Sequence, residues 1–211
     1  MKSTAELKPL KFGTLNARLV DVLSDRIFSG QLKAGERLNE SQLARQLEIS
    51  RSPIREALHS LEEQGIVINK PRRGMFVVNL TDNDVKKIGE IRIILEAKAL
   101  SLCAEHFDPD LERQLSQLIE ELDSRDASVE TSIRRADLEF HRLIWNRSGN
   151  EHLEAALTRL TAPLFVYVAA MLNRGKRGRA VAHRPFLQFL QGQSNQTAEG
   201  VVLEHVKEGY G

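Results

Sequence analysis

The stretch SQLARQLEISRSPIREALHSLEEQGIVINKPRRGMFVVN, residues 41–79, decides the fold of the N-terminal part of the chain. Asn39, just before it, can cap a first short helix. Ser52 is the expected cap of a second helix, with Pro53 in its first position and Gly65 as its terminator. After Gly65, two short apolar runs joined by a basic turn predict a β-hairpin. Two helices followed by a hairpin are the layout of a winged helix-turn-helix.

The second helix has one apolar and one polar face. The apolar residues recur at helical spacing and are Ile54, Ala57, Leu58 and Leu61. A helix fits the major groove of duplex DNA, cationic side chains at its N-terminal end reach base edges or phosphates, and a basic hairpin can grip the flanking backbone. The residues predicted to contact DNA are Arg51, Ser52, Arg55, His59, Lys70, Arg72, Arg73 and Gly74.

Composition fits two modest domains, which we place at residues 1–80 and 81–211. Hydrophobic residues make up 41% of the 211 positions, enough to give each domain a core. The first domain has 13 basic and 9 acidic residues, net +4, and the second has 17 and 20, net −3. Aromatic residues are only 5% of the chain, which argues against a stacking surface for single strands. Duplex DNA is the better partner for the basic half.

No segment predicts export or membrane insertion. The longest apolar run, residues 162–172, is too short to span a bilayer, and no apolar block follows the N-terminal lysines. Cys103 is the single cysteine and lies among apolar neighbours, so we expect a buried thiol without redox chemistry. The sequence therefore predicts a cytoplasmic protein with no membrane partner.

From Thr81 onward the periodicity is helical. Thr81 and Asp84 form a predicted capping box, Asp108 is the expected cap of the next helix, and Pro163 is expected to kink a later one. The predicted helices cover about 81–102, 108–124, 129–148, 150–173, 181–190 and 196–208. The fold class is therefore mainly α, with a winged helix-turn-helix followed by an all-α bundle of about six helices.

Four polar residues of this helical part have the chemistry of a metal site. Asp137 and His141 are four apart, so they project from one helical face, about one turn from each other. His183 and His205 lie on two late helices, and an antiparallel arrangement could bring both toward the first pair. Spacing alone leaves open the simpler interpretation, in which each is an isolated surface or core residue.

The first 80 residues resemble the GntR family of bacterial transcription regulators. The resemblance rests on SRSPIREALHSLEEQGIVINKPRRGMFV and on the preceding link GQLKAGERLNE. It implies that Arg51 and Arg55 are placed on DNA. Ser41 stands where many relatives have arginine, so no DNA contact is assigned to it.

The segment DLEFHRLIWNRSGN, with its later histidines, resembles the FCD domain, the effector-binding module of FadR-type GntR regulators. The resemblance implies that Asp137, His141, His183 and His205 hold a divalent ion beneath a ligand pocket. Zinc, nickel, manganese and iron all suit one carboxylate and three imidazoles. The polar segment QGQSNQTAEG departs from the regular helix of relatives and makes His205 the weakest member.

Arg92 and Glu96 are one turn apart in IRIILEAKAL, a spacing that also fits a surface ion pair. The FCD resemblance implies that the arginine here faces the cavity, so Arg92 is the expected anchor of a carboxylate effector. Arg135, Arg142 and Tyr167 are further candidates whose direction the sequence does not give.

The sequence thus predicts a ligand-responsive transcription regulator, a repressor in our interpretation, and not an enzyme. It would bind operator DNA as a homodimer and respond to a small organic acid. Two alternatives stay open: a regulator that responds to the metal itself, and a metal-dependent enzyme.

Overall fold

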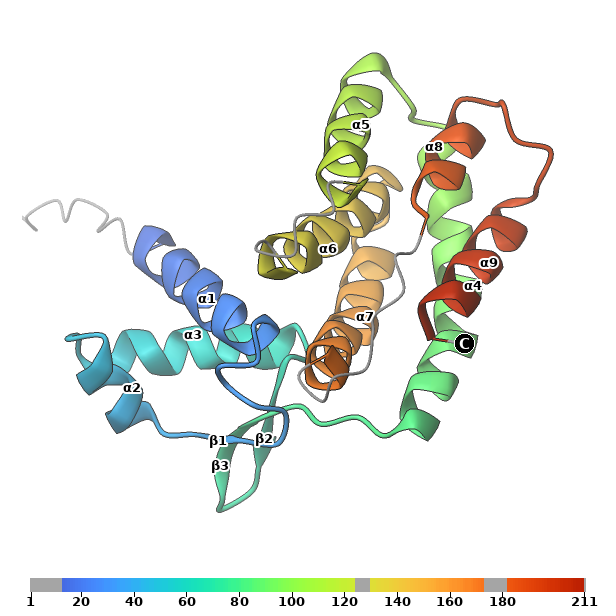
Figure 1. The fold of residues 1–211 in the computed structure, drawn as a ribbon. Coiled ribbons are helices and arrows are strands. Elements are labelled where there is room, and N and C mark those ends of the chain that lie inside the picture. The colour runs from blue at the N-terminus through green and yellow to red at the C-terminus, as the bar shows by residue number, and fades with distance from the viewer. Residues whose placement is uncertain (1–12, 124–129, 173–181, 211) are drawn as a thin grey trace, which may run out of the picture.

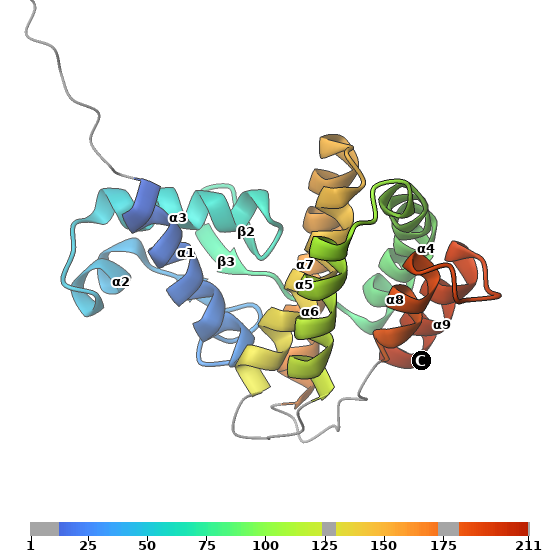
Figure 2. The same ribbon diagram turned by 90° about the horizontal axis from the view of Figure 1, so that it is seen from above.

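The computed structural model describes residues 13–123, 130–172 and 182–210. Its elements are α1 (Gly13–Phe28), β1 (Arg37–Leu38), α2 (Glu40–Gln46), α3 (Arg51–Glu63), β2 (Val67–Lys70), β3 (Gly74–Val77), α4 (Asp82–Ala104), α5 (Pro109–Asp123), α6 (Glu130–Arg147), α7 (Glu151–Leu172), α8 (Arg184–Leu190) and α9 (Ala198–Tyr210). Helices α1–α3 and the small sheet lie at one end, α4, α8 and α9 at the other, and α6 and α7 between them (Figures 1 and 2). The predicted fold class, a winged helix-turn-helix with a helical C-terminal part, is confirmed.

The helix-turn-helix follows its sequence pattern closely. Asn39 caps α2 by accepting hydrogen bonds from the backbone N–H groups of Ser41 and Gln42. The predicted inner face of α3 is buried throughout: Ile54, Ala57, Leu58 and Leu61. Gly65 ends this unit with φ +77°, a left-handed conformation that glycine adopts without strain.

The predicted start of α3 is wrong by two residues. Ser50, with φ −73° and ψ 165°, is the N-cap, so Ser52 and Pro53 already lie inside the first turn. Proline is tolerated there because the first N–H groups of a helix have no partner within it. Ser52 instead donates a hydrogen bond to Glu56 over 3.3 Å.

The wing is a three-stranded sheet in the order β1-β3-β2. In the hairpin, Val67 pairs with Val77 and Lys70 with Gly74. Strand β1 pairs Arg37 with Phe76 and was not predicted, because two residues carry no alternation that sequence reading can detect.

In the helical part, α4 and α5 begin at the capping residues that the sequence predicted. Thr81 and Asp84 form the reciprocal capping box of α4, and Asp108 accepts from the backbone of Leu111 at the start of α5.

Cys103 is buried, and burial raises the pKa of its thiol to about 12, in line with an unreactive side chain. In the described ranges this part contains six helices, α4–α9.

Helix α7 forms the centre of the molecule. Over Glu151–Met171 it is long and apolar enough to cross a bilayer by length and composition. Here it packs against α1, α4 and α6, with Leu157, Phe165 and Val166 buried. It continues through Pro163.

The C-terminal end of α3 meets the helical part directly. Nη2 of Arg142, on α6, donates a hydrogen bond to Oε1 of Gln64 over 3.0 Å. A Cβ at Gly65 would lie 2.7 Å from the backbone oxygen of Arg159, so only glycine fits this approach. Arg135 adds an ion pair of 2.6 Å to Asp21 on α1. The two residues that follow α3 therefore contact α6 and α7.

Candidate functional site

The exposed face of α3 and the wing enclose a hollow of about 350 Å³. Four residues predicted to contact DNA line it, namely Arg51, Arg55, His59 and Gly74. The side chains of Arg51 and Arg55 are 62% and 54% exposed, so both can reach a docked duplex. Contact of this face with the major groove stays a prediction.

The other four predicted DNA contacts lie outside this hollow. Arg72 and Arg73 are exposed in the turn of the wing, Ser52 is exposed on α3, and Lys70 lies over the ring of Phe76 at 4.6 Å. Their positions suit contacts with flanking phosphates rather than with the groove floor.

Sequence reasoning missed Arg37 and Glu40, which also line the hollow. Arg37 is brought there by the unpredicted pairing of β1 with β3. Oε2 of Glu40 accepts from Nε of Arg55 at 3.2 Å and from Nη2 of Arg55 at 3.0 Å. These hydrogen bonds lower the pKa of Glu40 and raise the pKa of Arg55, so both are ionised at neutral pH. The sequence signal was the position of Glu40 directly after the cap of α2.

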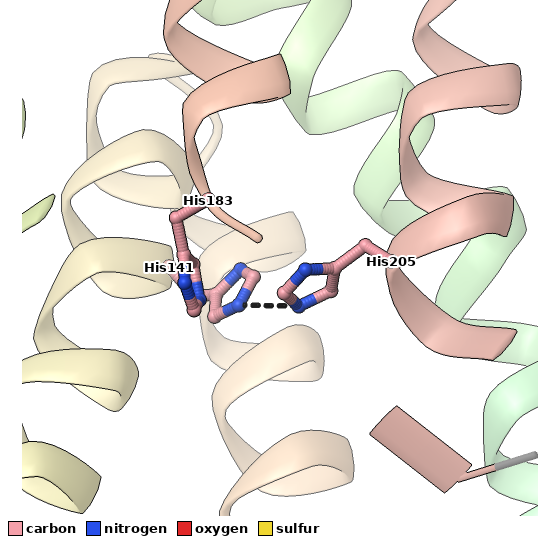
Figure 3. Close-up of side chains that lie close together, drawn as sticks. All are labelled: His141, His183 and His205. Atoms are coloured by element: carbon pink, nitrogen blue, oxygen red, sulfur yellow. Dashed lines mark hydrogen bonds between the residues drawn. The ribbon is translucent and has the colours of Figure 1, made fainter. Parts of the chain in front are cut away.

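In the helical part the structure brings the four predicted metal ligands together. His141 comes from α6, His183 from the N-cap of α8 and His205 from α9, and their three rings converge (Figure 3). One ring nitrogen of each lies within 4.8 Å of the others. Oδ1 of Asp137 is 2.9 Å from Nε2 of His183 and 3.4 Å from Nε2 of His141. His205, the weakest member by sequence, lies within the group.

The second nitrogen of two of these histidines faces an oxygen outside the cluster. Nδ1 of His141 is 2.5 Å from Oε1 of Glu96, and Nδ1 of His205 is 3.4 Å from the carbonyl oxygen of Ala182. A neutral imidazole that donates from Nδ1 keeps the lone pair of Nε2 directed into the cluster. Histidines that bind metals are commonly oriented in this way.

Arg92 and Glu96 do not form the surface pair that their spacing also allowed. Arg92 is 2% and Glu96 0% exposed, with Nε of Arg92 2.6 Å from Oε2 of Glu96. Nε1 of Trp145 donates to the other oxygen of Glu96 over 3.2 Å. Nη2 of Arg92 lies 3.1 Å from Nε2 of His141, so the guanidinium borders the histidine cluster. Its role as an effector anchor stays a prediction.

The charges of this region are mutually dependent. Burial raises the pKa of Asp137 and of Glu96, but the adjoining cationic groups outweigh burial and hold both pKa values below the ordinary range. Burial lowers the pKa of His205 well below its ordinary value, and the positive charge of His141 adds to this effect. Burial also lowers the pKa of His141, but Glu96 outweighs it and raises that pKa. His205 is therefore neutral, which is the form that binds metals.

The three further effector candidates each have a partner outside the histidine cluster. Arg135 pairs with Asp21, Arg142 with Gln64, and the hydroxyl of Tyr167 donates to Asp82 over 2.9 Å. Two of these contacts join the helical part to the winged helix.

Comparison with known proteins identifies both parts. Residues 15–77 match the family of bacterial regulatory proteins named gntR, and residues 87–208 match the FCD domain. The chain belongs to the GntR family. These families and the relatives below are transcriptional regulators, not enzymes.

The relatives include repressors. The chain is 34% identical over 191 residues to the HTH-type transcriptional regulator YdhC of Bacillus subtilis (strain 168), covering 87% of this chain and 84% of the relative. It is 30% identical over 152 residues to the gluconate operon transcriptional repressor of the same organism, covering 66% of this chain and 62% of the relative. Among solved structures, Escherichia coli McbR/YncC aligns over 92% of this chain and 93% of its own with a TM-score of 0.69. At 24% identity that likeness shows the fold.

Proposed function

We propose that this GntR-family regulator binds a divalent metal and a small carboxylate effector in its helical part and operator DNA through α3 and the wing. The observation that carries the proposal is the convergence of three imidazoles and Asp137 on one point, with Glu96 and Ala182 behind two of the rings. The family matches fall on either side of the predicted division between residues 80 and 81, and we keep that division. We also propose a cytoplasmic repressor, because repressors are named among the relatives.

The donor set fits a metal. Metal binding requires the histidines in their neutral form, so an ion would have to displace a proton from His141, whose pKa is raised. With Asp137 and Glu96 ionised and Arg92 protonated, the deprotonated site would carry a net negative charge that a divalent cation would reverse. Asp137, His141, His183 and His205 would hold the ion. When bound, it would supply a positive centre to which an effector carboxylate can attach.

Metal and effector should be coupled through Arg92. Its Nη2 contacts the same nitrogen of His141 that an ion would need, so the two cannot use that lone pair together. Loading of the cluster would displace this contact, and the positive charge of the guanidinium would stay beside the ion, where an effector carboxylate could meet both charges.

A titration tests the proposal. Organic acids, gluconate among them, are screened by thermal shift against the full chain with and without Zn²⁺, Ni²⁺ or Mn²⁺, and hits are measured by calorimetry. We expect an acid that stabilises the metal-loaded protein and binds more weakly after chelation. Equal binding after chelation would contradict the coupled site. A change in operator affinity with metal alone would favour the metal-responsive alternative.

Arg55→Ala tests the DNA reader. If Arg55 contacts a base, its loss should weaken binding to operator by about 1–3 kcal/mol and binding to random duplex much less. Electrophoretic mobility shifts on both duplexes at one salt concentration measure the difference. Equal losses on both would mean that Arg55 meets only phosphate.

We propose that the regulator is a homodimer that pairs through α4. Ile94 and Ile91 on α4 are 69% and 49% exposed, above the other exposed large apolar side chains of the described residues. Glu90 and Lys98 lie one turn on either side of Ile94, so antiparallel pairing centred there would place Glu90 opposite Lys98 of the partner subunit. A two-fold dimer would in turn read a pseudo-palindromic operator.

Ile94→Lys should therefore shift the protein to monomer in sedimentation velocity at micromolar concentration. Val22→Lys on α1, where the side chain is 39% exposed, is the control and should leave the oligomeric state unchanged. Glu90→Lys alone should also dissociate the dimer, and Glu90→Lys with Lys98→Glu should restore it. A dimer that survives Ile94→Lys would contradict this surface.

A further inference from the structure

A carboxylate sits inside the basic hollow, where the phosphates of DNA would disfavour it. Glu40 is the first residue of α2 and lines the hollow together with Arg51 and Arg55. Its side chain is 25% exposed, so it is neither remote from the duplex nor fully covered. A negative charge here reduces non-specific attraction to DNA, which depends on the net positive charge of the surface.

The contacts of Glu40 define the position of Arg55. Nε and Nη2 of Arg55 both donate to the carboxylate, within 3.0–3.3 Å. Hydrogen bonds from Nε and Nη2, which form one edge of the guanidinium, fix its plane. The N–H groups that point away from Glu40, here called the outer N–H groups, are left for another acceptor. The outer N–H groups are those that can bind O6 and N7 of guanine together. Arg51 Nη2 approaches the same carboxylate at 3.7 Å.

We propose that Glu40 is a positioning residue that sets sequence specificity: it orients Arg55, and more weakly Arg51, toward base edges and lowers affinity for arbitrary DNA. The inference rests on the proposed reading of bases by Arg55. Glu40 need not touch the DNA for this role.

Glu40→Gln provides the test. The probes are a duplex enriched from a random-sequence library by the full-length protein and a scrambled duplex of equal length. We expect affinity for the scrambled duplex to rise several-fold, affinity for the enriched duplex to fall, and their ratio to drop by about tenfold or more. Glu63→Gln, the matched control, removes one charge from an exposed position of α3 that does not line the hollow and should leave the ratio unchanged.

Glu40→Asp separates geometry from charge. It keeps the charge on a side chain one methylene shorter, so the ratio should fall without a gain on scrambled DNA. Circular dichroism confirms folding of each variant. An unchanged ratio in folded Glu40→Asp and Glu40→Gln would overturn the inference.

The Arg55→Ala variant distinguishes a failure of the role proposed for Glu40 from a failure of the proposed base contact by Arg55. Once Arg55 is removed, adding Glu40→Gln should change the ratio little further, because the two residues act together. If Arg55→Ala lowers the ratio and Glu40→Gln does not, the role proposed for Glu40 is wrong, while the base contact proposed for Arg55 is retained. If Arg55→Ala keeps the full ratio, base reading by Arg55 is itself wrong, and the role of Glu40 falls with it.

Discussion

Replacing Glu96 with alanine is expected to lower the free energy of unfolding by about 3–5 kcal/mol. Glu96 is fully buried and faces Nε of Arg92, Nε1 of Trp145 and Nδ1 of His141. Removal of the carboxylate takes away the buried ion-pair partner of Arg92 at position 96 and the hydrogen-bond acceptor of Nε1 of Trp145. Breaking a buried ion pair by removing one partner costs more than the apolar area that is lost with the side chain.

Urea denaturation followed by circular dichroism measures this effect, with chelator present so that metal does not contribute. Glu120→Ala on α5, an exposed position, is the control and should change stability by no more than about 0.5 kcal/mol. A loss below about 1 kcal/mol for Glu96→Ala would show that water or a rearranged neighbour replaces the carboxylate.

His141→Ala is expected to reduce affinity for a divalent metal by at least about a hundredfold. Loss of an outer partner of a metal ligand typically costs 10–100-fold, and loss of a ligand should cost no less. The variant should also lose the thermal stabilisation that metal gives to the unaltered protein. Binding to random duplex should be retained, since it depends on the basic winged helix.

Metal analysis of the purified chain and calorimetric titration with Zn²⁺, Ni²⁺ and Mn²⁺ measure the affinity. His152→Ala provides the matched control, because His152 is an exposed histidine on α7 outside the cluster. If His141→Ala binds metal as tightly as the unaltered chain, His141 is not a ligand. If the unaltered chain binds none of these ions, the site assignment itself is wrong.

Local patterns account for what the sequence predicted of the fold. Three predicted features each depend on a pattern of only four to eight residues, and all three are confirmed. They are the inner face of α3, the N-cap at Asn39 and the capping box at Thr81. The start of α3 was misplaced because Ser50 and Ser52 are chemically equivalent caps. Their difference lies in backbone angles that residue type does not encode.

Long-range pairing accounts for what was missed. The sequence left open a surface pair between Arg92 and Glu96, because the contacts of Glu96 to His141 and Trp145 join α4 to α6 across more than forty positions. Likewise, Arg37 reaches the hollow between α3 and the wing through a two-residue strand. Spacing alone offered the four proposed metal ligands as one of two interpretations, because it could not show that His183 and His205 meet, and the family resemblance favoured the site.

The contacts of Gln64 and Gly65 with α6 and α7 limit how the two parts of this regulator can be exchanged with those of other regulators. A chimeric biosensor that joins this helical part to another winged helix would need glycine at position 65, because any side chain there collides with the backbone at Arg159. It would also need an acceptor at position 64 for Arg142, the immediate neighbour of His141. The interchangeable unit therefore does not end at the linker before α4. A working graft must carry Gln64 and Gly65, which directly follow α3, along with the effector part.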